Sequence, residues 1–258
     1  MKKLTYSFLL WLAACPAFSQ TQIVAHRGAS YLAPENTVAA ADLAWTLDAD
    51  AVEIDIHLSK DGEVVVCHDH TTKRTGGQDL VIAETNAKDL RKLDVGQWKD
   101  SKYKGEKIPF ISEVFETVPK GKKLVVEIKC GPEVLPALKR AVAASGKADQ
   151  AIFIAFGWET ILATKEAFPS NACYWLSSKK EGLSERLEEA AKLGLDGVNL
   201  HYRIVDQDVM ALADQLDLDV LCWTVDDPEE AKRLVDLGIM AITTNRPAWL
   251  LEQLEAKN

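Results

Sequence analysis

The sequence predicts a single (β/α)8 barrel of the TIM type. Eight short β-branched runs alternate with amphipathic stretches of helical length, which is the pattern of a parallel sheet. Eight such units in about 240 residues match the size of one barrel. No stretch rich in Gly, Ser and Pro divides the chain into domains. A doubly wound open sheet is the alternative architecture.

The first 19 residues have the composition of a signal peptide. Two lysines precede the apolar run Leu9 to Ala14, and Ala17-Phe18-Ser19 offers a cleavage site of small residues. We therefore expect export to the periplasm or beyond, with residues 20–258 as the mature chain. Lipidation at Cys15 is an alternative, although Pro16 follows it directly. A retained anchor is not expected, because the apolar run is shorter than the roughly 20 residues that span a bilayer.

The mature chain is acidic. Loss of residues 1–19 removes two lysines and no acids, so the net charge moves from −9 to −11. This charge disfavours nucleic-acid binding, and an anionic substrate needs cations placed locally. The mature cysteines lack the spacing of a zinc or redox site, so we expect buried thiols in strands, with disulfide pairing left open: Cys67, Cys130, Cys173 and Cys222.

Each predicted strand is built around a short run rich in β-branched residues. They are Ile23–His26, Ala51–His57, Leu124–Lys129, Ile152–Phe156, Ala172–Leu176, Gly197–Leu200, Val220–Val225 and Ala241–Thr244. The predicted helices lie between them and often carry start or stop signals, such as Asp227 before Pro228 and Gly194 after a helix end. They are Pro34–Leu47, Ser112–Val118, Pro132–Ala144, Trp158–Ala167, Glu181–Leu193, Asp206–Leu216, Pro228–Leu237 and one from Pro247.

One additional run, Glu63 to His68, does not fit the alternation. It follows the second strand too closely for the crossover that a parallel neighbour needs, so it must fold back as a hairpin. Asp61-Gly62 predicts a two-residue turn there. The remaining stretch, to Pro109, is rich in Lys, Gly and Asp. We therefore predict a small insertion of about residues 57–110 after the second barrel strand.

The second and third barrel strands carry acids on one face. Glu53 and Asp55 alternate with apolar residues and face the barrel interior, and Glu127 repeats the pattern. Carboxylates confined together repel one another, and a hard cation relieves this repulsion. Three carboxylates without thiols suit Mg²⁺ or Ca²⁺ better than zinc. Structural salt bridges with Lys or Arg are the alternative.

Two histidines are expected at the same barrel edge. His26-Arg27-Gly28 closes the first strand, and Pro34 to Thr37 opens the next helix, where backbone N–H groups beside Arg27 can receive a phosphate. The two-residue turn would pair Asp55 with His68. A histidine acts as acid or base near neutral pH, as phosphodiester cleavage requires. A structural histidine under a loop is the alternative for His26.

The other histidines and a tryptophan are expected around this site. The hairpin register would set His70 opposite Glu53, and we expect His70 to be peripheral. His57 is expected on the hairpin surface. His201 is also peripheral but closer to substrate, and Trp223 either walls the pocket or packs in the core.

An ordered set of motifs resembles the glycerophosphodiester phosphodiesterase family, which belongs to the PI-phospholipase C-like barrels. The resemblance extends from about Gln22 to Pro247. The motifs are His26-Arg27-Gly28 with Pro34-Glu35-Asn36-Thr37, the segment Glu53 to Gly62, Val66-Cys67-His68-Asp69, Val126 to Lys129 and Trp223 to Asp226.

The resemblance implies hydrolysis of a glycerophosphodiester to sn-glycerol 3-phosphate and an alcohol. It implies His26 and His68 as the acid and base, in unassigned order, and a cation on the three carboxylates. Arg27 and Lys129 would contact phosphate, and Glu35, Trp223 and His201 are placed at the substrate. A cyclic phosphate intermediate or direct attack by water both remain open.

One position departs from the family pattern. Asn245 stands where the family usually has Asp, which leaves the head-group preference open. A phospholipase D-like hydrolase of lysophospholipids or sphingomyelin is an alternative. The insertion offers few apolar rings, Trp98, Tyr103 and Phe110, so we favour a soluble substrate. A binding protein without catalysis is a second alternative, but it would not need both histidines.

Overall fold

The computed structural model describes residues 21–256 and shows a closed barrel of eight parallel strands, as the sequence predicts. β1 pairs with both β9 and β2, which closes the ring. The barrel strands are β1 Gln22–Ala25, β2 Ala51–Leu58, β4 Lys123–Ile128, β5 Ala151–Ala155, β6 Cys173–Ser177, β7 Gly197–His201, β8 Asp219–Trp223 and β9 Ala241–Thr244.

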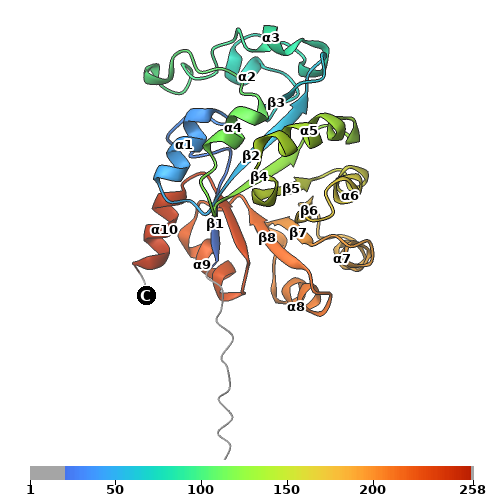
Figure 1. The fold of residues 1–258 in the computed structure, drawn as a ribbon. Helices are drawn as coiled ribbons and strands as arrows, with labels where there is room; N and C mark the ends of the chain where they lie inside the picture. The colour runs from blue at the N-terminus through green and yellow to red at the C-terminus, as the bar shows by residue number, and fades with distance from the viewer. Residues whose placement is uncertain (1–20, 257–258) are drawn as a thin grey trace, which may run out of the picture.

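Helices surround the barrel, as Figure 1 shows. The first begins later than predicted, because Thr37 is its N-cap and accepts a hydrogen bond from the backbone N–H of Ala40, leaving Pro34 to Asn36 in the preceding loop. The main helices are α1 Val38–Thr46, α4 Ile111–Thr117, α5 Leu135–Ser145, α6 Trp158–Ala167, α7 Leu183–Lys192, α8 Gln207–Gln215, α9 Pro228–Asp236 and α10 Pro247–Glu255. Short 3₁₀ turns occupy Pro132–Val134, Ala148–Gln150 and Tyr202–Ile204.

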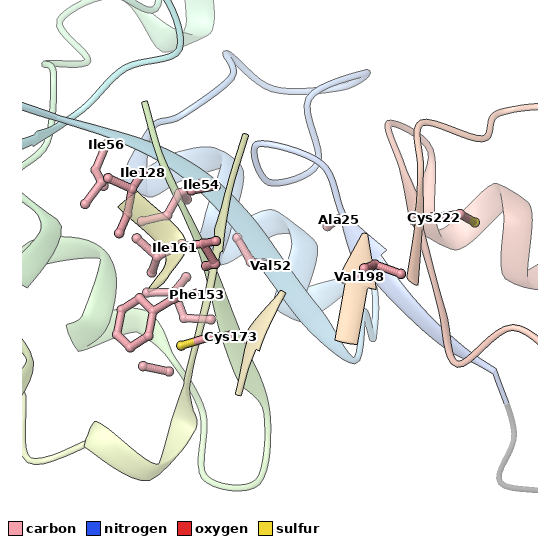
Figure 2. Packing of buried hydrophobic residues seen from close by; sticks show 14 of the residues in the cluster. Ala25, Val52, Ile54, Ile56, Ile128, Phe153, Ile161, Cys173, Val198 and Cys222 are labelled. Atoms are coloured by element: carbon pink, nitrogen blue, oxygen red, sulfur yellow. The ribbon is translucent and has the colours of Figure 1, made fainter. Parts of the chain in front are cut away.

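The core explains which strand residues face inward. Val52, Ile54 and Ile56 of β2 are buried in the large cluster between strands and helices, near Phe153 and Ile161 (Figure 2). A smaller cluster fills the barrel interior and includes Ala51 and Val125. Strand alternation therefore directs Glu53 and Asp55, which share a face with Ala51, into the barrel.

The hairpin forms, but its predicted register is wrong. β3, Val64–Val66, pairs antiparallel with β2, with Leu58 opposite Val64. The loop has three residues between the paired ends Ser59 and Glu63, and Gly62 takes the left-handed conformation at φ +82°. A three-residue loop shifts the pairing by one residue relative to a two-residue turn.

The shift moves the partners of both acids. Cys67, not His68, lies opposite Asp55 and donates its N–H to the Asp55 carbonyl. For the same reason, the prediction that His70 lies opposite Glu53 is wrong. His68 comes after the last residue of β3, where the chain has left the ladder.

The insertion has its own small core and lies beyond the carboxyl end of β2, outside the ring of helices (Figure 1). Its elements are β3, α2 Lys73–Gly76, η1 Ile82–Glu84, α3 Ala87–Leu90 and η2 Ser101–Tyr103. Its apolar cluster consists of Val65, Cys67, Ile82, Ala87, Leu90, Leu93, Val95 and Ile108. Arg91 connects the insertion to the barrel by donating a hydrogen bond to the carboxylate of Glu113 in α4.

Within residues 21–256, no helix is long and apolar enough to span a membrane. The predicted signal peptide, with Cys15, lies outside the described residues. The four cysteines of the described chain are free thiols, with Cys173 and Cys222 buried in β6 and β8.

Candidate active site

A pocket of about 440 Å³ opens at the carboxyl ends of the barrel strands. This is the end at which TIM barrels place their active sites. Most of the predicted site residues meet there, together with an apolar wall. The lining residues include His26, Arg27, Glu53, His68, Glu127, Lys129, Ile154, Phe156, Leu176, Asn199 and Trp223.

Three carboxylates form the floor of the site. Oxygens of Glu53, Asp55 and Glu127 lie within 4.8 Å of one another, and all three residues are buried. The parallel register sets Asp55 directly beside Glu127. Among residues 21–256, Glu53 Oε1 and Asp55 Oδ1 find no hydrogen-bond donor although both atoms are buried. Unpaired buried oxygens of this kind are the ligands that a hard divalent cation takes.

The electrostatics of this cluster disfavour three negative charges without a counter-ion. Burial and then the charges of Asp55 and Glu127 raise the pKa of Glu53 well above its ordinary value. Burial and Asp55 raise the pKa of Glu127 to about 7, against the opposing effect of Lys129. A cation between the carboxylates would favour their ionised forms.

Two basic side chains partly balance the acids. Lys129 Nζ lies 2.7 Å from Glu127 Oε1 and 3.5 Å from Asp55 Oδ1. Arg27 Nε lies 3.4 Å from Asp55 Oδ2, and the Arg27 backbone N–H donates to Glu53 Oε2 at 2.8 Å. The alternative of structural salt bridges is thus partly realised. The ion pairs nevertheless leave two carboxylate oxygens without hydrogen bonds in the described chain.

Glu35 lies next to this group rather than in the pocket wall. Its carboxylate accepts hydrogen bonds from Arg27 Nη1 and from both terminal nitrogens of Arg74. Burial would raise its pKa, but the bonds from Arg74 and Arg27 outweigh burial and lower the pKa to about 2. Glu35 therefore fixes the Arg27 guanidinium from outside the pocket.

His26 sits at the end of β1 in a setting that keeps it neutral. Its Nδ1 lies 2.7 Å from Asn245 Oδ1, in the loop after β9. Burial, and then the charge of Arg27, lowers the pKa of His26 to about 4. A neutral imidazole near pH 7 can accept a proton.

His68 reaches the same pocket from the insertion. Its Nδ1 lies 2.7 Å from Asp69 Oδ1, and Arg74 Nε donates to Asp69 Oδ2 at 2.8 Å. His57 Nε2 lies 3.2 Å from the carbonyl oxygen of His68. The prediction that His57 is a surface residue is wrong: it is 8% exposed and holds the backbone of His68.

Aromatic residues form one wall. Trp223 ends β8 and donates its indole N–H to the Asn199 carbonyl, and its ring meets the Phe156 ring edge-on at 5.4 Å. His201 stands behind Trp223, with ring centroids 5.2 Å apart, and does not itself line the pocket. His70 is exposed on the insertion.

Several residues at the site were given no role from the sequence. Asn36 donates to Asp55 Oδ2 at 2.7 Å and accepts the Asp55 backbone N–H. Arg74 links Glu35 to Asp69. Asn199 is 1% exposed, and its Oδ1 has no hydrogen-bond donor within the described chain. The signal available for Asn199 was a polar residue between the apolar residues Val198 and Leu200 of β7.

Comparisons with known proteins find relatives that match nearly the whole described chain. A phosphodiesterase of Oleispira antarctica, solved with the product sn-glycerol-3-phosphate, is 30% identical, with a TM-score of 0.85 over 92% of this chain and 97% of that chain. A glycerophosphodiester phosphodiesterase of Caldanaerobacter subterraneus is 30% identical over 90% of this chain and 97% of its own length. One from Thermotoga maritima is 25% identical, with a TM-score of 0.76 over 91% of this chain and 98% of that chain.

The sequence pattern of one family covers nearly the whole described chain. The match runs from residue 26 to residue 249 and takes in both histidines and all three carboxylates of the pocket. The protein therefore belongs to the glycerophosphoryl diester phosphodiesterase family of enzymes.

Proposed function

We propose that this protein hydrolyses glycerophosphodiesters, such as glycerophosphocholine or glycerophosphoethanolamine, to sn-glycerol 3-phosphate and an alcohol, with the aid of a divalent cation. The observation that carries the proposal is a pocket lined by two histidines, two carboxylates and two basic residues, with a third carboxylate, Asp55, within 4.8 Å of the other two. The product bound to the Oleispira relative is the product expected here.

The carboxylate cluster fits a cation. Glu53, Asp55 and Glu127 would hold it, because their buried oxygens include two without donors in the described chain. An all-oxygen donor set favours Mg²⁺ or Ca²⁺. When bound, such an ion supplies charge neutralisation and lowers the pKa of a coordinated hydroxyl or water.

Arg27 and Lys129 would receive the phosphate. Both line the pocket and both already neighbour the carboxylates. Their positive charges would offset the charge that builds on the phosphate oxygens as the new bond to phosphorus forms. The acidic net charge of the chain makes this local supply of cations necessary.

The histidines would carry the protons. One takes the proton of the attacking hydroxyl, and the other supplies a proton to the departing alkoxide. The attacking group is either water or the neighbouring glycerol hydroxyl, and the second route passes through a cyclic phosphate. Trapping the cyclic phosphate in a rapid quench separates the two routes.

A lysophospholipid or sphingomyelin substrate is the second candidate, and one surface feature favours it. Tyr31 and Leu32, in the loop after β1, are 55% and 51% exposed. Tyr103 of the insertion lies beside them, with its hydroxyl donating to the Leu32 carbonyl, so a lipid tail would find apolar contact near the rim.

The proposal is tested by incubating purified protein with glycerophosphocholine, with and without a chelator. Release of choline and glycerol 3-phosphate that stops on chelation supports it. Phosphocholine would show cleavage on the other side of phosphorus. Faster turnover of lysophosphatidylcholine would favour the second candidate. No turnover with any of several divalent cations would contradict enzymatic function and favour a binding protein.

We also propose that the protein is exported to the periplasm or secreted. The proposal is supported by the signal-like sequence of residues 1–19. Cell fractionation and the N-terminal sequence of the recovered protein test it. Mature protein starting at Gln20 agrees with cleavage after Ser19, and lipid labelling lost in Cys15→Ser would show a lipoprotein instead.

A further inference from the structure

The orientation of one amide decides the chemistry of His26. Asn245 Oδ1 lies 2.7 Å from His26 Nδ1. An amide oxygen only accepts hydrogen bonds, whereas its nitrogen only donates. The state of the ring therefore depends on which end of the Asn245 side chain faces it.

Asp226, in the loop after β8, fixes that choice. Its Oδ2 accepts a hydrogen bond from the side-chain amide nitrogen of Asn245 at 2.6 Å. Its Oδ1 accepts hydrogen bonds from the backbone N–H of Asn245 at 2.9 Å and from the Thr244 hydroxyl at 2.8 Å. A carboxylate has no proton to donate, so the Asn245 nitrogen must face Asp226 and its oxygen must face His26. Ser30 Oγ also donates to that oxygen, at 3.2 Å.

We infer that Asn245, oriented by Asp226, is a positioning residue that fixes His26 as the Nδ1–H tautomer and so makes its Nε2 the proton acceptor of the reaction. Nε2 is the nitrogen left for the pocket that His26 lines. The inference rests on the proposed function for its catalytic meaning, but the tautomer is a property of the free protein.

The assignment fixes the direction of proton transfer. The oxygen of the attacking hydroxyl forms a new bond to phosphorus as its O–H bond breaks, and the proton joins Nε2 of His26. On the other side, a proton leaves Nε2 of His68, whose Nδ1 faces Asp69, and joins the leaving oxygen as its bond to phosphorus breaks. The lowered pKa of His26, about 4, agrees with a ring that starts neutral.

Asp226→Asn tests the inference because it changes a charge without changing size. The new side chain can still accept from Thr244 and from the Asn245 backbone with its oxygen. Its nitrogen would then face the Asn245 nitrogen, so the Asn245 amide should turn over and donate to His26 Nδ1. His26 would become the Nε2–H tautomer and lose its acceptor.

The expected result is a fall in kcat by roughly 10²-fold or more, with unchanged affinity for the divalent cation by calorimetry. In ¹⁵N NMR of histidine side chains, the protonated nitrogen of His26 should switch from Nδ1 to Nε2. This readout does not depend on turnover, so it stands apart from failure of the proposed function.

The double variant Asp226→Asn/Asn245→Asp provides the rescue. A carboxylate at 245 would accept from the amide at 226 and from His26 Nδ1–H, which should restore the original tautomer and most of kcat. If Asp226→Asn does not fold, Asn245→Ala serves instead and should give a mixture of tautomers. An unchanged His26 tautomer in the variants, or a double variant no better than the single one, would overturn the inference.

Discussion

The two histidines of the pocket are held in opposite ways. His26 belongs to the barrel. Its partner Asn245 and the Asp226 that orients Asn245 follow neighbouring barrel strands. His68 belongs to the insertion, and its partners Asp69 and Arg74 are local to it. The His68, Asp69 and Arg74 side chains are 30%, 32% and 43% exposed, and His26 is itself half-buried, but burial and then the charge of Arg27 lower the pKa of His26.

The difference indicates a division of labour. In the proposed reaction, the barrel would supply a neutral proton acceptor beside the carboxylate cluster. The insertion would supply a histidine that is close to solvent and paired with a carboxylate, from which a proton could be replaced after each turnover. Barrel changes should therefore act mainly on cation binding and the acceptor, and insertion changes should act mainly on the second histidine.

Removal of a carboxylate from the barrel should have the largest effect. Glu53→Gln deletes a charged ligand and should weaken binding of Mg²⁺ or Ca²⁺ by more than roughly 100-fold, because changes even in residues behind metal ligands cost 10- to 100-fold. Titration calorimetry on chelated protein measures this. Glu84→Gln, on the exposed surface of the insertion, is the control. Equal cation affinity in both variants would rule out the carboxylate site.

The pH dependence of the cation-free protein should be the next largest effect. Glu127 has a pKa of about 7 when folded against 4.5 ordinarily, so the folded form binds more protons between these values. Its contribution to the free energy of unfolding is present below pH 4.5 and falls as pH rises towards 7, by up to about 3 kcal/mol. His26, with a lowered pKa, contributes a rise between about pH 4 and 6.5.

The comparison of wild type with Glu127→Gln separates these opposing slopes. Urea unfolding with chelator at pH 5, 6 and 7 should show that wild type loses stability relative to the variant as pH rises. Addition of the divalent cation should remove the difference in slope, since it favours the ionised carboxylate. Parallel plots of unfolding free energy against pH for the two chelated proteins would mean that burial does not raise the pKa of Glu127.

Arg74→Ala should act mainly on the insertion side, because Glu35 keeps its bond from Arg27. Its bonds to Glu35 and Asp69 would be lost, and turnover should fall about 10-fold through misplacement of His68, less than removal of His68 itself. Stability should change little, because the pairs are partly exposed. Lys73→Ala, which removes the neighbouring pair with Asp79, is the matched control. A similar loss in both variants would point to general loosening of the insertion.

Gly62→Ala should have the smallest effect. Gly62 has φ +82° and Gly121, between α4 and β4, has φ +87°, both with open space around the position of a Cβ. Each substitution to Ala should lower the free energy of unfolding by about 1 kcal/mol through the left-handed backbone. Turnover should stay unchanged in both. A loss confined to Gly62→Ala would show that the turn itself also places His68.

Regular periodicity predicted the parts of the site that lie on strands. Alternation along β2 and β4 was sufficient to put Glu53, Asp55 and Glu127 on one inner face, and the parallel register then set them side by side. The closed barrel followed from the count of strand and helix units. The chemical roles of these residues stay predictions.

Loops and long-range contacts were less accessible from the sequence. Asp61-Gly62 fits both a two- and a three-residue loop, and only the second gives the observed register. His57 is buried, and its Nε2 lies 3.2 Å from the carbonyl oxygen of His68 in the chain that follows β3. The bond between His26 and Asn245 joins residues 219 positions apart, which no local pattern reveals.

The division between the histidines is tested most directly with two leaving groups. Wild type, His26→Ala and His68→Ala are compared on glycerophosphocholine and on the p-nitrophenyl ester of glycerol phosphate. The p-nitrophenolate ion leaves without a proton donor. On glycerophosphocholine, both variants should lose roughly 10²-fold or more. On the nitrophenyl ester, His68→Ala should recover most of its activity while His26→Ala should not. Recovery by His26→Ala instead, or equal losses on both substrates, would contradict the assigned roles.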